Sequence, residues 1–188
     1  MNIAVVDNGG QWTHREYRVI RDLGSEARIV PNTSTLAELN AEGIVLSGGA
    51  LSLEGSDAPL GRVGEWIDRI EVPVLGICVG HQYLARHFGG TVSRARTPEF
   101  GRVTVTLESE GDPLLGGLPS SLEVWESHND EVVRPPPGWR RLGYSSTCHV
   151  EAMGHPSRPI WGVQFHPEVE HTEKGRELFQ NFLTQCRR

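Results

Sequence analysis

One cysteine stands between two glycines in a pattern that suits covalent catalysis. Cys78 follows the apolar run Pro73–Ile77 and precedes a stretch with helical character, and Gly76 and Gly80 stand two positions before and after it. A sharp strand-to-helix turn brings those two positions together, where side chains would clash and glycine fits. Such a turn places the sulfur at the N-terminus of a helix, whose unpaired N–H groups favour the thiolate, the attacking form of cysteine. We therefore predict that Cys78 is a nucleophile.

The base that such a nucleophile needs is expected at the end of a later strand. His166 closes the apolar run Ile160–Phe165, and Pro167 then turns the chain, so that Glu168 can return to the imidazole. A histidine moves the proton during acyl transfer, and a carboxylate fixes its tautomer. We predict a catalytic triad of Cys78, His166 and Glu168.

The same segment has a second interpretation as a metal site. Glu170 and His171 follow His166 and Glu168 closely, and imidazole and carboxylate groups at such spacing can ligate zinc. No cysteine or further histidine converges on this segment in the sequence. We therefore favour the triad and expect neither a metal nor a cofactor in this chain.

A glycine-rich turn is expected to complete the site. Ser47-Gly48-Gly49 follows the strand Gly43–Leu46, and turns at the carboxyl ends of parallel strands line the sites of doubly wound sheets. We expect the backbone N–H groups of Gly49 and Val79 to hold an oxyanion. The turn lacks the Lys-Ser/Thr ending of a nucleotide P-loop, and Leu51 stands where ATP pyrophosphatase loops carry an acid. We expect no ATP site in this chain.

The composition excludes other classes of protein. The chain has 188 residues and a net charge of −6, whereas a nucleic acid partner would need clustered Lys and Arg. No apolar run approaches the ~18 residues that span a bilayer, and the N-terminus resembles a buried strand rather than a signal peptide. Three widely spaced cysteines are typical of a reducing cytoplasm, and Cys148 and Cys186 are expected to be ordinary small apolar residues. We expect a cytoplasmic protein that contacts neither membranes nor nucleic acid.

The elements that must position these residues alternate through the first half. Short apolar runs bounded by Gly, Pro or Asp are typical of strands buried on both faces of a parallel sheet, and stretches with a helical stripe lie between them. The expected strands are Ile3–Asp7, Ala27–Val30, Ile44–Ser47 and Val72–Ile77, and the expected helices are Trp12–Leu23 and Leu60–Ile70. This alternation predicts an α/β fold.

The second half favours mixed or antiparallel strands that extend the sheet. The expected strands are Val103–Leu107, Leu122–Trp125, Val132–Val133, Arg141–Tyr144 and Ile160–Phe165, before a helix from Thr172 to Gln185. The sequence has no repeat, linker or low-complexity segment. Residues 1–188 are therefore expected to form a single domain.

Two motifs together resemble the class I, or triad-type, glutamine amidotransferases. They are Gly76-Ile77-Cys78-Val79-Gly80-His81-Gln82 and Gln164-Phe165-His166-Pro167-Glu168. Finer features resemble the GMP synthetase branch of this family: Asp7–Gln11, Val124–His128 and His166–Gly175. The resemblance covers nearly the whole chain. It implies a flavodoxin-like α/β fold, with a mostly parallel central sheet flanked by helices and extra antiparallel strands in the second half.

The resemblance also implies a role for each matching residue. Cys78 attacks the side-chain amide of glutamine, His166 protonates the leaving ammonia and then activates water, and Glu168 orients His166. Gln82 and the loop of Ser127, His128, Asn129 and Asp130 bind the backbone groups of glutamine. Many members have proline where this chain has Ala50, and glycine where it has Asn129. These departures leave the side-chain contacts of that loop open.

A partner is implied as well. A GMP synthetase in one chain carries an ATP pyrophosphatase domain after the amidotransferase, whereas this sequence ends after its last helix, so the resemblance implies the separate-subunit form found mainly in archaea. That form is a heterodimer of purine biosynthesis, in which an XMP-binding, GMP-forming ligase subunit receives the ammonia and uses ATP and Mg.

Two alternatives remain open at this point. One is a glutaminase for another synthesis, of anthranilate, aminodeoxychorismate, imidazole glycerol phosphate or carbamoyl phosphate, and the ending His171-Thr172-x-x-Gly175 argues against it. The other is a hydrolase or sensing protein of the same fold. The paired His166 and Glu168 argue against that class.

Overall fold

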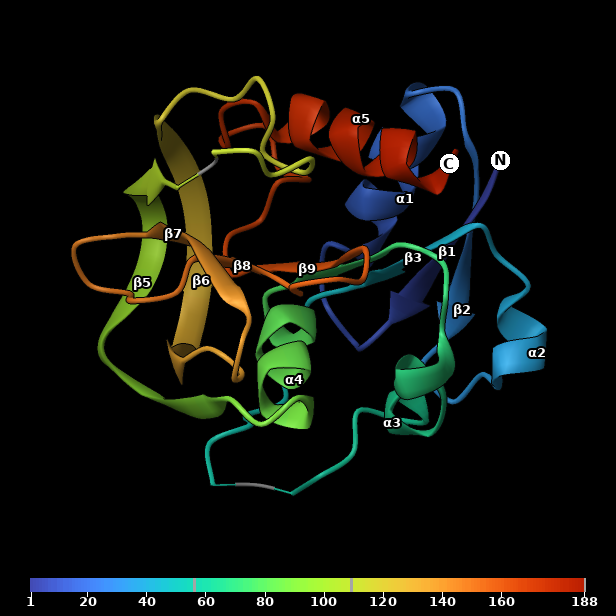
Figure 1. The fold of residues 1–188 in the computed structure, drawn as a ribbon, viewed down its shortest axis with the longest axis horizontal. Helices are drawn as coiled ribbons and strands as arrows, with labels where there is room; N and C mark the ends of the chain where they lie inside the picture. Colours follow the sequence, from blue (N-terminus) through green and yellow to red (C-terminus); the bar gives the residue numbers. More distant parts are fainter. Residues whose placement is uncertain (56, 109, 188) are drawn as a thin grey trace.

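The strands form one sheet in the computed structural model, which describes residues 1–55, 57–108 and 110–187. They are β1 Asn2–Asp7, β2 Glu26–Pro31, β3 Gly43–Leu46, β4 Val74–Ile77, β5 Thr91–Leu107, β6 Ser121–Arg134, β7 Arg140–Tyr144, β8 Ala152–Gly154 and β9 Ile160–Val163. Their order across the sheet is β2-β1-β3-β4-β9-β8-β7-β5-β6 (Figure 1). The first five strands in that order pair in parallel and the others antiparallel.

The parallel part has the strand order of flavodoxin-like folds. The expected class is therefore confirmed: an α/β fold with a mostly parallel centre and antiparallel strands added in the second half. In such sheets, ligands bind beyond the carboxyl ends of the parallel strands. The segments that follow β1, β3, β4 and β9 are thus the ones to examine for a site.

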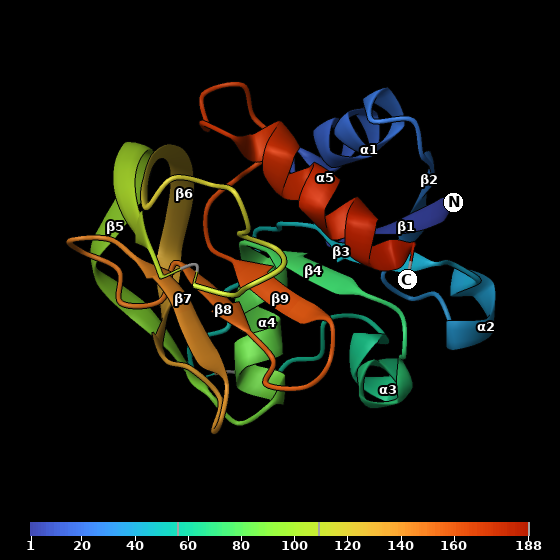
Figure 2. The same cartoon turned by 45° about the horizontal axis from the view of Figure 1, so that its top comes forward.

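Helices cover both faces of the parallel strands. They are α1 Thr13–Asp22, α2 Leu36–Leu39, α3 Val63–Trp66, α4 Val79–His87 and α5 Gly175–Cys186, with a 3-10 helix at Ile67–Arg69. Helices α1 and α5 lie side by side over one face, and α3 and α4 lie on the other (Figures 1 and 2). No helix in the described part of the chain is long and apolar enough to cross a membrane.

The two faces explain the apolar runs of the first half. Along β1, Ile3 and Val5 belong to the core that includes residues of α1 and α5, whereas Ala4 and Val6 belong to the core that includes residues of α3 and α4. Strands that bury both faces need apolar residues at every position. The runs expected as strands in the first half all lie in parallel strands.

The second half differs from the expected short strands at several points: Val103–Leu107 is only the last part of β5, and the expected strand Ile160–Phe165 ends at Val163 in β9. Leu122–Trp125 and Val132–Val133 are parts of a single strand, β6, because the polar residues between them also pair with β5. The register of this pairing shifts between Arg94 and Glu99, so that Glu99 lies opposite His128. β8 has no expected counterpart, because a three-residue strand carries too little pattern.

The helix bounds also differ in part. The expected helix Leu60–Ile70 is only α3 and the 3-10 helix, because Gly61 has a φ of +55° and a Cβ there would overlap the carbonyl oxygen of Asn32. The left-handed turn at Gly61 therefore delays the helix. The last helix begins at Gly175 rather than at Thr172, whose side chain is used elsewhere.

Candidate active site

Cys78 occupies a strained turn between β4 and α4. Its φ of 51° and ψ of −106° are rare for a residue with a side chain, and such strain is typical of functional positions. Its backbone N–H donates to the Val163 carbonyl at 2.9 Å, and its carbonyl accepts from the Gln82 N–H at 3.0 Å. Because both ends of the residue are held, the turn keeps its sulfur at the start of α4.

The glycines around this turn are required by close approach. A Cβ on Gly76 would lie 2.7 Å from the carbonyl carbon of Gly80. A Cβ on Gly80 would overlap the carbonyl oxygen of Leu46, in the neighbouring strand β3. The spacing Gly-x-Cys-x-Gly therefore has the physical cause that the sequence predicted.

His166 follows β9 and is held at both ends of its peptide unit. Its N–H donates to the Trp125 carbonyl at 3.0 Å, and its carbonyl accepts from the Thr172 hydroxyl at 2.7 Å. Its Nδ1 lies 2.7 Å from Oε1 of Glu168, and both side chains are buried. The indole of Trp12 meets the imidazole edge-on, with 4.4 Å between ring centroids. The imidazole thus has one fixed position, with Cys78 beside it.

The electrostatics of this cluster favour a charged imidazole. Burial opposes protonation, but the Glu168 carboxylate and hydrogen bonds with Cys78 and Glu168 outweigh it and raise the pKa of His166 to about 10. A protonated imidazole stabilises a neighbouring thiolate. Glu16, from the first turn of α1, adds no charge here, because burial, followed by the charge of Glu168, raises the pKa of Glu16 well above its ordinary value.

The raised pKa of His166 makes a prediction for stability. An imidazole that binds its proton more tightly in the folded protein than at the unfolded value of about 6.5 contributes stability that is complete below that pH. This contribution is lost as the pH rises through the folded pKa of about 10. We expect the free energy of unfolding, measured by urea denaturation, to fall as the pH rises from about 6.5 to about 10. The fall should be steeper in the wild type than in His166→Asn. The variant His14→Asn, at an exposed position, is the control, and equal slopes for all three proteins would contradict the prediction.

Two backbone N–H groups beside Cys78 are free to hold an anion. Among the described residues, neither the Gly49 N–H nor the Val79 N–H donates to another group. The turn after β3 is pressed against the triad, since a Cβ on Gly48 would lie 3.2 Å from Cε1 of His166 and 3.6 Å from Cβ of Cys78. Unpaired N–H groups beside a nucleophile can stabilise a tetrahedral oxyanion.

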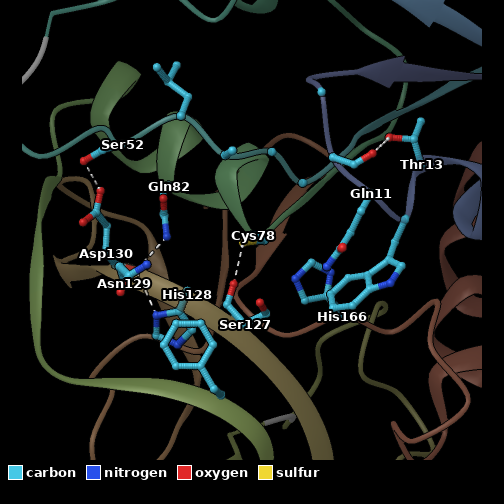
Figure 3. A pocket seen from close by; sticks show the side chains of 18 of the residues that line it. Gln11, Thr13, Ser52, Cys78, Gln82, Ser127, His128, Asn129, Asp130 and His166 are labelled. Atoms are coloured by element: carbon cyan, nitrogen blue, oxygen red, sulfur yellow. Dashed lines mark hydrogen bonds between the residues drawn. The ribbon is translucent and has the colours of Figure 1, made fainter.

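A cavity of about 500 Å³ opens beside these groups (Figure 3). All of the site residues predicted from the sequence line it, apart from Val79; they are Gly49, Cys78, Gln82, Ser127, His128, Asn129, Asp130, His166 and Glu168. The structure thus brings together residues from the carboxyl ends of β3, β4 and β9 and from the middle of β6. Glu170 and His171, the further members of the alternative metal set, are exposed and do not line the cavity.

The expected loop of Ser127–Asp130 is the middle of strand β6, and it contacts both the nucleophile and Gln82. The Cys78 sulfur lies 3.9 Å from the Ser127 carbonyl oxygen (Figure 3). The amide nitrogen of Gln82 donates to the Asp130 carbonyl at 2.7 Å. The Asp130 carboxylate accepts from the Ser52 hydroxyl at 2.6 Å, which ties this part of β6 to the segment after β3. This wall of the cavity is therefore a connected set of hydrogen bonds.

The sequence analysis did not predict some of the contacts at the site. Trp12 contacts His166 from a distant segment, and Thr172, noted in the sequence only as part of a family motif, binds the His166 carbonyl from six residues away. Glu99 contacts His128 across the hairpin, at 2.8 Å from its Nε2. An acid at an inward-facing position of a strand is the one feature that could have indicated Glu99.

Comparisons with known proteins agree with this geometry. A family model described as glutamine amidotransferase class-I matches residues 4–186. The chain is 49% identical over 187 residues to a subunit of GMP synthase (glutamine-hydrolyzing) from Thermoplasma acidophilum, covering 99% of this chain and 93% of that one. The protein of the same name from Thermococcus kodakarensis is 48% identical over 188 residues, with 98% of each chain covered.

Solved structures support the fold. The crystal structure of a GMP synthase subunit from Thermoplasma acidophilum superposes with a TM-score of 0.93, at 49% identity, covering 100% of this chain and 94% of that one. A glutamine amidotransferase of Thermotoga maritima superposes with a TM-score of 0.79 at 19% identity, covering 99% of this chain and 97% of that one. At that identity the likeness shows the fold alone.

Proposed function

The chain belongs to the class I glutamine amidotransferase family, and from this premise we propose that it is the glutaminase subunit of a two-subunit GMP synthase. The observation that carries the proposal is the convergence of Cys78, His166 and Glu168 on one cavity, beside two unpaired backbone N–H groups. The relatives that support the GMP branch match nearly the full length of the chain. Residues 1–188 then act as one amidotransferase domain.

The first half of the reaction forms a thioester. The Cys78 thiolate adds to the side-chain amide carbon of glutamine, and the charge that develops on oxygen is held by the N–H groups of Gly49 and Val79. His166 gives its proton to the departing nitrogen, so that ammonia leaves as the C–N bond breaks. Glu168 keeps the imidazole in the orientation that this transfer needs.

The second half releases glutamate. His166, now neutral, takes a proton from water as the water oxygen attacks the thioester carbonyl. The C–S bond then breaks, the Cys78 thiolate is restored, and His166 keeps the proton for the next cycle. The net change is glutamine and water to glutamate and ammonia, with no cofactor in this chain.

The ammonia must reach a second protein to be useful. We propose that a separate ATP pyrophosphatase subunit binds XMP, ATP and Mg and converts XMP to GMP, and that the two subunits form a heterodimer. The relatives support this because each is named as one subunit of a GMP synthase. All three cysteines are free thiols, which is typical of a reducing compartment, and we propose the cytoplasm.

A reconstituted assay tests this proposal. The chain is mixed with the candidate ATP pyrophosphatase subunit from the same source, together with XMP, ATP and Mg. We expect GMP formation that depends on glutamine, with one glutamate released for each GMP. If the partner forms GMP from added ammonia but the complex cannot use glutamine, the proposed function is wrong. Chorismate in place of XMP, with the matching synthase, tests the alternative partner.

A further inference from the structure

Glu99 and His128 form a buried pair beside the cavity, whose lining includes His128, and they take no part in the reaction above. The side chains of His128 and Glu99 are 1% and 3% exposed. His128 Nε2 lies 2.8 Å from the Glu99 carboxylate, and Nδ1 lies 2.9 Å from the Asp130 carbonyl oxygen. The Asp130 carbonyl is an acceptor, so Nδ1 donates its proton to that carbonyl, and Nε2 is held by the Glu99 carboxyl group.

Glu99 is held by several hydrogen bonds. Besides its contact with His128, its carboxylate accepts from the Ser145 hydroxyl at 2.6 Å and from the Thr147 hydroxyl. Burial alone would raise the pKa of Glu99, but the hydrogen bonds from His128, Ser145 and Thr147 outweigh it and lower the pKa to about 2. The carboxylate is thus fixed in place, and it holds the imidazole of His128 in turn.

Several titratable groups packed around this pair have shifted pKa values. Burial raises the pKa of Glu126 and of Glu151 well above the ordinary value, and the charge of Glu99 adds to the effect at both. Burial also raises the pKa of the Cys148 thiol and lowers the pKa of His81 to about 3. Glu126 also contacts the pair, with its Oε2 3.5 Å from His128 Nε2.

The backbone carbonyl group of Asp130 connects the pair to Gln82, which lines the cavity. The Asp130 carbonyl accepts from His128 Nδ1–H and from the Gln82 amide nitrogen. The same amide nitrogen donates to Gln164 Oε1 at 3.0 Å. Because both neighbours of the nitrogen are acceptors, the Gln82 amide has one orientation, with its nitrogen toward Asp130 and its oxygen away from it (Figure 3). Among the described residues, no group donates to that oxygen, and Gln82 lines the cavity.

We propose that Glu99 and His128 are positioning residues for the substrate. The imidazole, held by Glu99, fixes the Asp130 carbonyl and thereby the Gln82 amide, whose oxygen then accepts from the α-ammonium group of glutamine. The pair thus selects a substrate with an ammonium group through Asp130 and Gln82. This inference rests on the proposed glutaminase function and goes beyond the triad.

Two substitutions of His128 separate positioning from structure. The amide nitrogen of asparagine lies near the place of Nδ1, and that of glutamine lies near the place of Nε2. His128→Asn therefore keeps the donor to Asp130 and loses the donor to Glu99, whereas His128→Gln does the reverse. We expect His128→Asn to unfold at lower urea concentration but to keep KM for glutamine within about 3-fold of the wild type. We expect His128→Gln to be the more stable of the two and to raise KM about 10-fold or more, with a smaller change in kcat.

His149→Asn is the matched control. It makes the same substitution at an exposed histidine outside the cavity, and it should leave KM for glutamine unchanged. If the two His128 variants change KM in step with their stability, the pair is only structural and the proposal is wrong. Glutaminase activity of the wild type is measured first, since its absence would overturn the proposed function.

The hydrogen bond from His128 to Asp130 has a readout that does not need activity. In ¹⁵N-labelled protein, the chemical shift of His128 Nδ1 should report a bound proton at neutral pH. A ring without a proton on Nδ1 would overturn the proposal. So would a stoichiometric divalent metal in the purified protein, because Glu99, His128, Cys148 and Glu151 offer ligand atoms within 4.8 Å of one another and Nε2 would then bind the metal instead of being held by Glu99.

Discussion

Cys78→Ala is expected to reduce glutamine-dependent GMP formation at least about 10⁴-fold, while GMP formation from added ammonia persists. The substitution removes the atom that forms the thioester, and no other thiol lines the cavity in the described residues. The assay measures GMP and glutamate, with the partner subunit, in separate reactions with glutamine and with ammonium chloride. Ammonia-dependent activity shows that the partner is still loaded and competent.

Cys186→Ser is the control for this experiment. Cys186 is a partly buried thiol in α5, outside the cavity, so its loss should leave glutamine use unchanged. Glutaminase activity that survives in Cys78→Ala would contradict the triad. Loss of activity in Cys186→Ser to the same extent would show that the assay responds to general damage.

His166→Asn is expected to lower kcat for glutamine hydrolysis about 10³-fold. Asparagine cannot carry the proton to the leaving ammonia or take one from water, so both halves of the reaction slow. The strained turn at Cys78 does not depend on the imidazole, because its backbone is held by Val163 and Gln82. The nucleophile should therefore still react with a glutamine analogue that carries an electrophilic side chain, such as acivicin, but more slowly.

His171→Asn separates this interpretation from the metal interpretation of the same segment. His171 is 51% exposed at its side chain, and its ring lies outside the cavity, tilted against that of Trp125 with 4.9 Å between the centroids. We expect this variant to keep kcat within about 2-fold, since surface substitutions away from special features change little. A loss as large as that of His166→Asn, restored by added zinc, would favour a metal site over the triad.

The sequence predicts the nucleophile turn well because its cause is local. Gly76 and Gly80 are needed by contacts within the turn and with the adjacent strand β3, and such contacts leave a fixed spacing in the chain. The parallel strands are predictable for a similar reason, since burial on both faces makes each of them a continuous apolar run. The pairing of His166 with Glu168 is also local, two residues apart.

Long-range pairing explains what the sequence does not predict. Strand β6 reads as two short strands because its middle is polar, and only its pairing with distant residues of β5 shows that the strand continues. The sequence did not predict that the ring nitrogens of His128 contact Glu99 and Asp130. Glu99 stands 29 residues away, beyond a register shift that no periodicity reveals. The role of Ser127, His128, Asn129 and Asp130 in binding glutamine stays a prediction.

The most direct test of the central claim is to trap the thioester on Cys78. The chain, with its partner and substrates, is quenched in acid during turnover of glutamine, digested, and examined by mass spectrometry. We predict a glutamyl group on the peptide that contains Cys78, absent without glutamine and from the peptides of Cys148 and Cys186. Turnover with no glutamyl adduct on Cys78, or with the adduct on another residue, would contradict the claim that Cys78 is the nucleophile.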